Sequence, residues 1–415
     1  MSQPNPLSPG QLDPRRVLGQ SSIQTRSGDI CGIDLGEFVR RLLLFDTYVM
    51  YSVRLREFPL LIQHFGYEGV QELLASGAFQ VHFDCLMFAQ TAQSGILGEP
   101  ILPALTYKFR FVDASDWNDY FSKCANESAP RRRYPEKWQR LIDGVRVAAR
   151  RTAPEVRAQL FPEFLHELVP NAVLLKESIR RNLSEAENTS LSDFFIVPHQ
   201  ESEDVIRVET DIGSHLGLPL ERVHKIVEAG LMGISGLVLT IGHMKSHSAI
   251  TGFKAEELPL FRRKLGCLAA LASSGSQEQT FQRVMEISGL AELPNRKGVR
   301  IKTDKLLRLR DSGECREFRD WLSSAGSASE EEIRDRVRSW NARLGTLVSG
   351  QAGKTVRFLT TLGLGLINLP TGIAASVFDS FLLDRLLPRS GIAAFVGESY
   401  PSLFKNASVD EGHQE

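Results

Sequence analysis

Residues 35–84 read LGEFVRRLLLFDTYVMYSVRLREFPLLIQHFGYEGVQELLASGAFQVHFD and alternate between two kinds of pattern. Apolar residues recur at helical spacing in two stretches, and a strand-like run follows each of them. The helices are expected at 35–44 and 56–76, with Gly66 and Gly77 at probable helix ends, and the strands at 48–53 and 79–84. With a third strand-like run at 105–113, this pattern predicts a small sheet flanked by helices over about residues 29–125.

The composition is that of an ordinary globular protein, since 42% of the 415 residues are hydrophobic and 24% are charged. Lys and Arg number 49 against 50 Asp and Glu, so bulk charge argues for no anionic partner. The cysteines are odd in number and form no Cys-x-x-Cys pair, which favours reduced thiols in a cytosol. Residues 1–28 hold no long apolar run, and we expect a flexible tail rather than a secretory signal.

Beyond residue 130 the pattern becomes increasingly helical. Residues 130–157 carry nine Arg or Lys against three acids around an apolar stripe, which predicts an amphipathic helix with a basic outer face. A second helix is expected at 163–182. Strand-like runs at 194–197 and 205–209 either extend the first sheet or make a separate ribbon, and the pattern is helical from Asp211 nearly to the end.

These patterns predict an α+β fold that is predominantly α-helical, with a small mixed sheet and helices near the N-terminus and helical middle and C-terminal regions. The expected divisions are a disordered tail at 1–28, a small α/β domain at 29–130, basic amphipathic helices with short strands at 131–210, a helical region at 211–292, a C-terminal helical domain at 293–405 and a disordered tail at 406–415.

The stretch 211–228, DIGSHLGLPLERVHKIVE, meets the requirements of a helix-turn-helix-like unit. Such a unit needs a small residue where two helices touch, a glycine at the turn and apolar residues that clamp the pair. Gly213 and Gly217 fill the first two roles. If the unit reads DNA, the side chains expected to face a groove are Arg222, His224 and Lys225.

An ordinary helical corner explains the same stretch. Glu221 and Glu228 place negative charge on the supposed reading helix, and residues 229–244 are uncharged, which suggests that the helix continues into a buried segment. The glycines at 230, 233 and 236 favour a close contact between helices over a phosphate-binding loop, because no clear strand precedes them.

Two basic stretches, 131–151 and 296–310, are further candidates for contact with nucleic acid, although a solvated basic face is the usual explanation of such runs. Their candidate contact residues are Arg131, Arg132, Arg133, Lys297, Arg300 and Lys302.

Residues 358–378 form an uncharged run of 21 residues. Its length suits a membrane span. Pro370 and Gly372 nevertheless favour a turn between two short helices, so we expect a buried hairpin, with entry into a membrane as the alternative.

Catalytic signatures are absent from the sequence: the glycine spacings fit neither a nucleotide loop nor a serine elbow. His243 and His247 are spaced like zinc ligands on a helix, but no glutamate lies beside the first, so we expect a hydrogen-bonded or solvent-facing pair rather than a metal site. Asp46, Asp84 and Asp113 are the carboxylates that a dispersed hydrolase site would use. No cofactor is implied.

The hypothesis that we take forward is a cytoplasmic, non-catalytic interaction protein that contacts nucleic acid through the helix-turn-helix-like unit and the basic stretches. The alternatives are an effector that docks on or enters a membrane through residues 358–378, and a hydrolase with a dispersed carboxylate site. A protein partner fits each of them, and the oligomeric state is left open.

Overall fold

The computed structural model describes residues 12–24, 30–52, 54–84, 87–93, 104–112, 117–130, 135–168, 172–202, 205–251, 269–294, 298–325, 331–339 and 391–404. Over these residues the fold is α+β and predominantly helical, as the sequence predicts.

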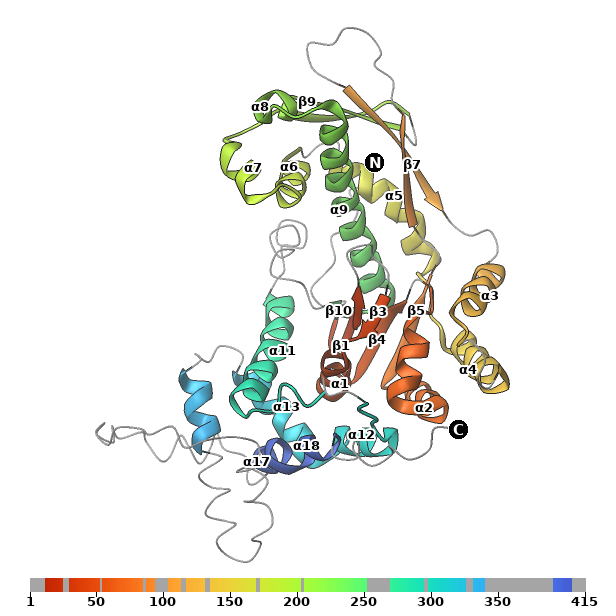
Figure 1. The fold of residues 1–415 in the computed structure, drawn as a ribbon, viewed down its shortest axis with the longest axis vertical. Helices are drawn as coiled ribbons and strands as arrows, with labels where there is room; N and C mark the ends of the chain where they lie inside the picture. The colour runs from red at the N-terminus through yellow and green to blue at the C-terminus, as the bar shows by residue number, and fades with distance from the viewer. Residues whose placement is uncertain are drawn as a thin grey trace, which may run out of the picture.

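A four-stranded parallel sheet lies in the lower half of the molecule in Figure 1. Its strands, in spatial order, are β10 (Ala249–Thr251), β1 (Asp13–Gly19), β4 (Thr47–Ser52) and β5 (Phe79–Phe83). Helix α1 (Leu35–Leu44) precedes β4, and α2 (Glu57–Ala75) joins β4 to β5. The connections from β1 to β4 and from β4 to β5 each contain a helix, as parallel pairing requires.

The flexible tail expected at 1–28 is wrong for residues 13–24. Residues 13–19 form β1, which pairs with β10 on one side and β4 on the other. Residues 22–24 form β2 (Ser22–Gln24), which pairs with β3 (Ile30–Ile33). The sequence of β1, DPRRVLG, contains one proline, two arginines and only two large apolar residues, so it lacks the apolar run of an ordinary buried strand.

A second sheet is antiparallel and lies in the upper half of Figure 1. Its order is β6 (Met87–Gln93), β7 (Ala104–Val112), β9 (Val205–Thr210) and β8 (Ile196–Gln200). The prediction that the run at 105–113 shares a sheet with those at 48–53 and 79–84 is therefore wrong. The strand-like runs near 194–197 and 205–209 join β7 in this separate sheet, which settles the choice that the sequence left open.

The helices that lie between β7 and β10 in the chain are α3 (Trp117–Ser128), α4 (Pro135–Ala148), α5 (Pro154–Leu168), α6 (Ala172–Arg181), α7 (Glu185–Ser190), α8 (Ile212–Leu216) and α9 (Leu220–His247). The helix expected at 163–182 is divided between α5 and α6, and α5 ends two residues before Pro170. A proline lacks the N–H that continues a helix and restricts the residue before it.

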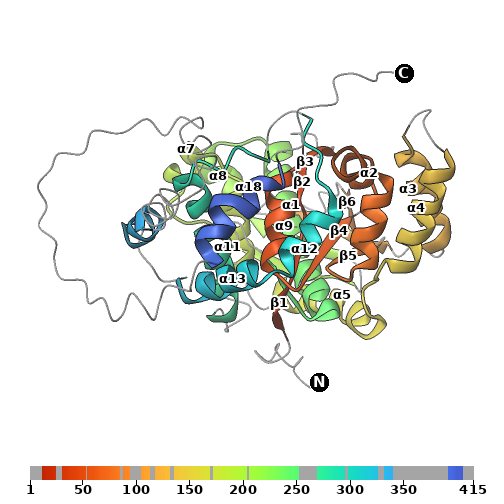
Figure 2. The same cartoon turned by 90° about the horizontal axis from the view of Figure 1, so that it is seen from below.

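The later helices are α11 (Ala269–Ile287), α12 (Thr303–Arg310), α13 (Gly313–Ala325), α17 (Gly391–Ala394) and α18 (Tyr400–Ser402), with a π-helical turn, η2 (Phe395–Ser399), before α18. Figure 2 shows that α11, α12, α13 and α18 gather beside and below α1. Residues 331–339 are also helical. The apolar run at 358–378 lies outside the described residues, as does Trp340, the last of the four tryptophans in the sequence.

Two hydrophobic clusters organise the packing, and α9 belongs to both. The lower cluster surrounds α1 and α2 and includes Phe38, Tyr48 and Phe79. The upper cluster contains most of the buried residues of α9, including Leu231, whereas Met244 near the end of the helix belongs to the lower cluster. Figure 1 shows α9 running from one half of the molecule to the other. The six expected divisions of the chain stay a prediction.

Candidate functional site

The two faces of the parallel sheet differ in polarity. On one face, alternate residues of β4 and β5 are apolar and pack under α1 and α2; Phe38 lies with its ring centroid 5.6 Å from Tyr48 and 5.3 Å from Phe79. Successive side chains in a strand point to opposite faces, so the residues between these belong to the other side of the sheet. That side carries Arg16, Tyr51, Gln80 and His82 beside the apolar Leu18 and Val49.

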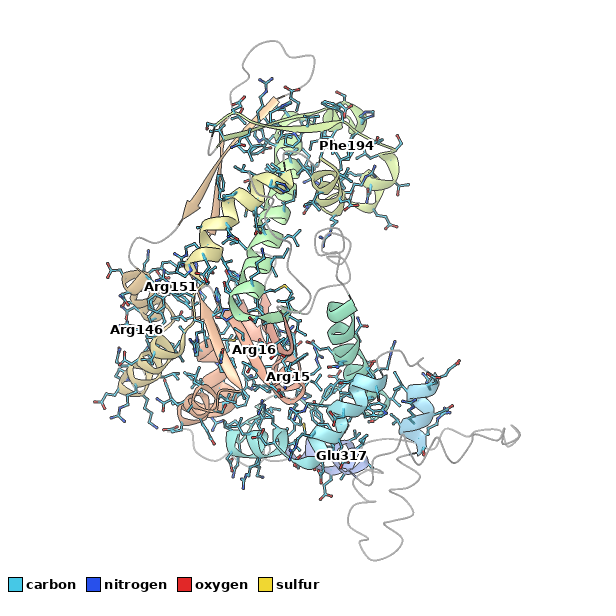
Figure 3. All side chains as sticks on the ribbon, turned by 180° about the vertical axis from the view of Figure 1, so that it is seen from behind. Arg15, Arg16, Arg146, Arg151, Phe194 and Glu317 are labelled. Atoms are coloured by element: carbon cyan, nitrogen blue, oxygen red, sulfur yellow. The ribbon has the colours of Figure 1, made fainter. Side chains whose placement is uncertain are left out.

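The polar face is covered by the last turns of α9. This end of the helix presents His243 and His247, which lie four residues apart and therefore on one side of the helix. On the sheet, the Arg16 guanidinium donates to Gln80 Oε1 at 3.2 Å, and Figure 3 shows Arg16 on the sheet next to the end of α9. A buried face of a parallel sheet is ordinarily apolar, so this interface is unusual.

The three histidines lie in direct contact, and we call His82, His243 and His247 the histidine cluster. His82 Nδ1 lies 2.6 Å from His247 Nε2, so one nitrogen donates a hydrogen bond to the other. The ring of His243 lies 4.3 Å from that of His82 and 4.8 Å from that of Tyr51, centroid to centroid. Among the described residues, neither His82 Nε2 nor His243 Nε2 has a hydrogen-bond partner, although both atoms are buried.

Burial keeps the cluster neutral at physiological pH. Burial lowers the pKa of His243 to about 4, partly opposed by the charge of Asp84. Burial and the cations of Arg16 and Arg150 lower the pKa of His247 to about 4. Burial lowers the pKa of His82 well below its ordinary value, and the two neighbouring histidines and the Arg157 cation contribute. Perturbed groups of this kind are concentrated at functional sites, and structural networks perturb them too.

Asp84 marks the carboxyl end of β5 beside the cluster. Its carboxylate accepts from the Thr152 backbone N–H at 2.8 Å and from the Arg157 guanidinium at 2.9 and 3.0 Å. Asp46 is exposed and immediately precedes β4, so it lies at the amino ends of the strands, whereas Asp84 lies at their carboxyl ends. Asp46 and Asp84 therefore do not share a site, and Asp113 lies outside the described residues.

The sequence draws attention to two members of the cluster but not to their surroundings. The sequence predicts a hydrogen-bonded or solvent-facing pair; His243 and His247 are both buried, His247 is hydrogen-bonded to His82, and His243 Nε2 has no partner among the described residues. The signal that could have indicated His82 is a titratable side chain inside an otherwise uncharged strand, FQVHF. Within the described part of the chain, no group of three or more His, Cys, Asp or Glu residues is arranged to hold a metal ion.

The helix-turn-helix-like stretch folds as α8, a turn and α9. Gly217 adopts the left-handed conformation with φ 62°, and its N–H donates to Gly213 O. A Cβ atom at Gly213 would lie 2.9 Å from Val223 Cγ2, so the small residue is required at the predicted contact. Pro219 is the N-cap residue of α9. Helix α8 has only five residues, while α9 has 28 and continues into the core.

The predicted groove-facing residues differ in accessibility. Arg222 and Lys225 are exposed, and each pairs with a glutamate: Arg222 with Glu187 at 3.5 Å and Lys225 with Glu221 at 2.8 Å. His224 is half-buried. Its ring lies 5.4 Å from the Tyr107 ring, and its carbonyl accepts from the Tyr107 hydroxyl at 3.3 Å.

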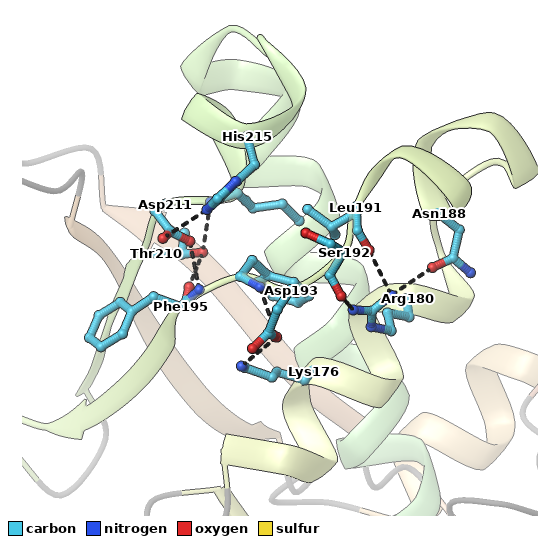
Figure 4. Close-up of polar contacts among 12 residues, drawn as sticks. Lys176, Arg180, Asn188, Leu191, Ser192, Asp193, Phe195, Thr210, Asp211 and His215 are labelled. Atoms are coloured by element: carbon cyan, nitrogen blue, oxygen red, sulfur yellow. Dashed lines mark hydrogen bonds and ion pairs between the residues drawn. The ribbon is translucent and has the colours of Figure 1, made fainter.

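In the corner beneath this turn, charged side chains form hydrogen bonds and ion pairs with other groups of the protein (Figure 4). Asp211 Oδ1 accepts from the Phe195 backbone N–H at 2.6 Å, and Asp211 Oδ2 pairs with His215 at 3.2 Å. On α6, Arg180 donates to the carbonyl oxygens of Leu191 and Ser192. The Asp211 contacts join α8 to the end of the antiparallel sheet. The Arg180 contacts occupy a cation that a ligand would otherwise meet.

The remaining predicted cations do not join Arg222 and Lys225. Arg300 and Lys302 are exposed just before α12, and Figure 1 shows α12 at the opposite end of the molecule from α8. Arg131, Arg132, Arg133 and Lys297 lie outside the described residues.

One described helix is long and apolar enough, by length and composition alone, to cross a membrane. This helix is α9, and 61% of its most apolar window is buried inside the protein. The core helix of a water-soluble protein passes the same test, so the observation is weak support for a membrane role.

No family model, no curated protein and no solved structure matches this chain.

Proposed function

We propose that this chain is a non-catalytic interaction protein that contacts nucleic acid at the start of α9. The observation that supports the proposal is the exposure of Arg222 and Lys225 on the first turns of a helix that follows a left-handed glycine turn. Cations on such a helix are suited to phosphate oxygens, and phosphate contacts supply most of the affinity of unspecific binding.

The glutamate partners of these cations do not prevent the contact. Lys225 and Glu221 have side chains 64% and 82% exposed, and Arg222 is 45% exposed beside Glu187. Exposed pairs of this kind contribute about 0–1 kcal/mol, so a phosphate can replace the glutamate at small cost. The glutamates nevertheless reduce the positive potential of this surface, and we expect weak binding governed by salt.

The accessible contact set is smaller than the sequence suggests. His224 packs on Tyr107 and is better explained as part of the corner than as a base-reading side chain. Arg300 and Lys302 lie at the other end of the molecule, so they form a second, independent candidate surface.

The test is fluorescence anisotropy with a labelled duplex and a labelled single strand across a salt series. We expect the slope of log affinity against log salt to fall by about 1.4–1.8 in magnitude in the double variant Arg222→Ala/Lys225→Ala, since each lost phosphate contact removes about 0.7–0.9. The matched control is Arg283→Ala/Arg338→Ala, which removes two exposed arginines that also pair with acids on their own helices.

The outcomes separate the two surfaces. Loss of slope in the α9 variant alone supports the proposal, whereas loss in Arg300→Ala/Lys302→Ala alone moves the contact to the α12 end. Binding that is absent, or that does not respond to salt, removes nucleic acid from the functional hypotheses.

The membrane alternative rests on residues 358–378, which lie outside the described residues, and it stays a prediction. Flotation of the intact protein with liposomes, beside a Leu364→Asp variant, tests it. Lipid association that the substitution abolishes would favour this alternative over nucleic-acid contact.

A further inference from the structure

We propose that the interface between the end of α9 and the polar face of the parallel sheet is a binding site for a small oxyanion of the phosphate class. Its ligating groups are His82 and His243, and its charge is supplied by Arg16 and Arg150. This site is independent of the proposed nucleic-acid contact, which lies at the other end of α9.

The first argument is the hydrogen-bond inventory of buried nitrogens. His82 is 0% exposed and His243 4% exposed, yet the Nε2 atom of each lacks a partner among the described residues. Arg16 Nε, on the same face of the sheet, is a third buried nitrogen without one. A buried polar atom left without a hydrogen bond costs about 1–3 kcal/mol, so a fold keeps several together when a ligand satisfies them.

The second argument is charge. Asp84 neutralises Arg157 through two hydrogen bonds. Arg16 and Arg150 have no acidic partner among the described residues, and Arg16 donates instead to the neutral amide of Gln80. Arg150 pairs with His82 in an isolated parallel β-bridge beside β5, so the side chains of these two residues lie on the same face of the sheet. The charges of Arg16 and Arg150 reach the histidine cluster at His247, and two cations without acidic partners among the described residues favour an anion over a metal ion there.

The third argument is position. Tyr51 and His82 are the penultimate residues of β4 and β5, and Asp84 follows β5 directly. The carboxyl ends of parallel strands are where α/β proteins bind their ligands. Ser248, the residue after His247, has φ 48° although it is not glycine, and this backbone strain lies where α9 turns into β10 beside the cluster.

An oxyanion also has a predictable effect on the histidines. A negative charge near the cluster favours the imidazolium form and raises the pKa of the histidine that it contacts. The groups that face the cluster are Arg16, Arg150, Arg157, Asp84 and Tyr51, and burial keeps Tyr51 neutral by raising its pKa to about 12. Binding of a phosphate dianion is therefore expected to raise the pKa of the histidine that it contacts above its value in the free protein.

The experiment is isothermal titration calorimetry of the intact protein at constant ionic strength, with inorganic phosphate, glycerol phosphate and acetate as probes. We expect saturable binding of phosphate or its monoester at or below about 1 mM, with weaker binding of acetate. Preference between the first two separates free phosphate from a phosphate carried on a larger ligand. Titrations at pH 6 in two buffers of different ionisation enthalpy measure the proton uptake.

The informative variant is His243→Leu, which removes one orphaned nitrogen and leaves an apolar side chain in a buried site. We expect it to bind phosphate at least tenfold more weakly while its unfolding midpoint is unchanged or raised. Arg150→Gln changes an exposed residue and is expected to weaken binding about fivefold. Arg140→Gln removes an exposed arginine of α4 outside the site and serves as the matched control.

Two results would overturn the proposal. The first is no saturable heat from phosphate or glycerol phosphate up to about 10 mM. A lowered unfolding midpoint of His243→Leu in that case would identify the cluster as a structural network. The second is binding that His243→Leu and Arg150→Gln leave unchanged.

Discussion

The His82–His247 contact joins residues 165 positions apart in the chain. Sequence spacing indicates that His243 and His247 share a helix side, but nothing local indicates that this side meets the polar face of a strand. The turn at Gly217 and the contact at Gly213 could be predicted, because the residues that require them lie within ten positions. At the residue scale, local geometry was therefore predictable and the histidine cluster was not.

The cluster makes a prediction about acid stability. The pKa of His243 and of His247 is about 4 in the folded protein, against about 6.5 in an unfolded chain. Between these values the unfolded state binds more protons than the folded state, so the unfolding free energy falls as the pH is lowered from about 6.5 to 4. Each histidine contributes about 1.4 kcal/mol per pH unit in this window.

Urea unfolding at several pH values between 4.5 and 6.5 measures this slope. His243→Leu is expected to reduce it by about one proton, and His166→Gln, which changes an exposed histidine of α5, is the matched control. An unaltered slope in His243→Leu would mean that this imidazole is protonated in the folded protein.

At the scale of elements, prediction succeeded where a segment carries its own periodicity. Helix α1 has the predicted bounds, and β4, β5 and β7 lie within one residue of theirs. Strand β10 has three residues, too few for a pattern, and β1 is dominated by polar residues and proline. These two strands are held by their neighbours in the sheet rather than by local propensity, so the sequence alone did not show them.

The glycines of α9 differ in whether a neighbouring helix packs against them. The predicted close contact between helices is present: a Cβ atom at Gly230 would lie 2.5 Å from Ile179 Cγ1 on α6. The Ser178 hydroxyl also donates to Gly230 O at 2.7 Å. Gly236 is different, because a Cβ atom there would have nothing within 4 Å.

Two alanine substitutions in α9 should therefore change stability in opposite directions. Gly230→Ala is expected to lower the unfolding free energy by about 1–3 kcal/mol, because the methyl group overpacks the contact with α6. Gly236→Ala is expected to raise it by about 0.5–1 kcal/mol, because alanine loses less backbone entropy in a helix. Chemical denaturation of both variants measures the difference, and equal effects would contradict the packing of α6 on α9.

At the scale of the whole molecule, the fold class could be predicted and the assembly of the sheets could not. Helices and strands were assigned from their periods, and together they define an α+β protein. Which strands pair depends on contacts between distant segments, such as β1 with β10, which are separated by more than 200 residues. The same holds for α9, whose two ends serve two hydrophobic clusters.

Because α9 is shared between the clusters, we expect the described parts of the molecule to unfold as one cooperative unit. Leu231→Ala deletes a fully buried side chain of the upper cluster and should lower the unfolding free energy by about 2–5 kcal/mol.

Three tryptophans pack with the lower cluster: Trp117, Trp138 and Trp321. In a Trp340→Phe background, tryptophan fluorescence therefore reports the lower cluster, while far-UV circular dichroism reports the whole chain. We expect Leu231→Ala to shift both transitions equally. A shift in circular dichroism with an unchanged fluorescence midpoint would show that the two clusters unfold separately, and α9 would then be a connector between two units rather than their common core.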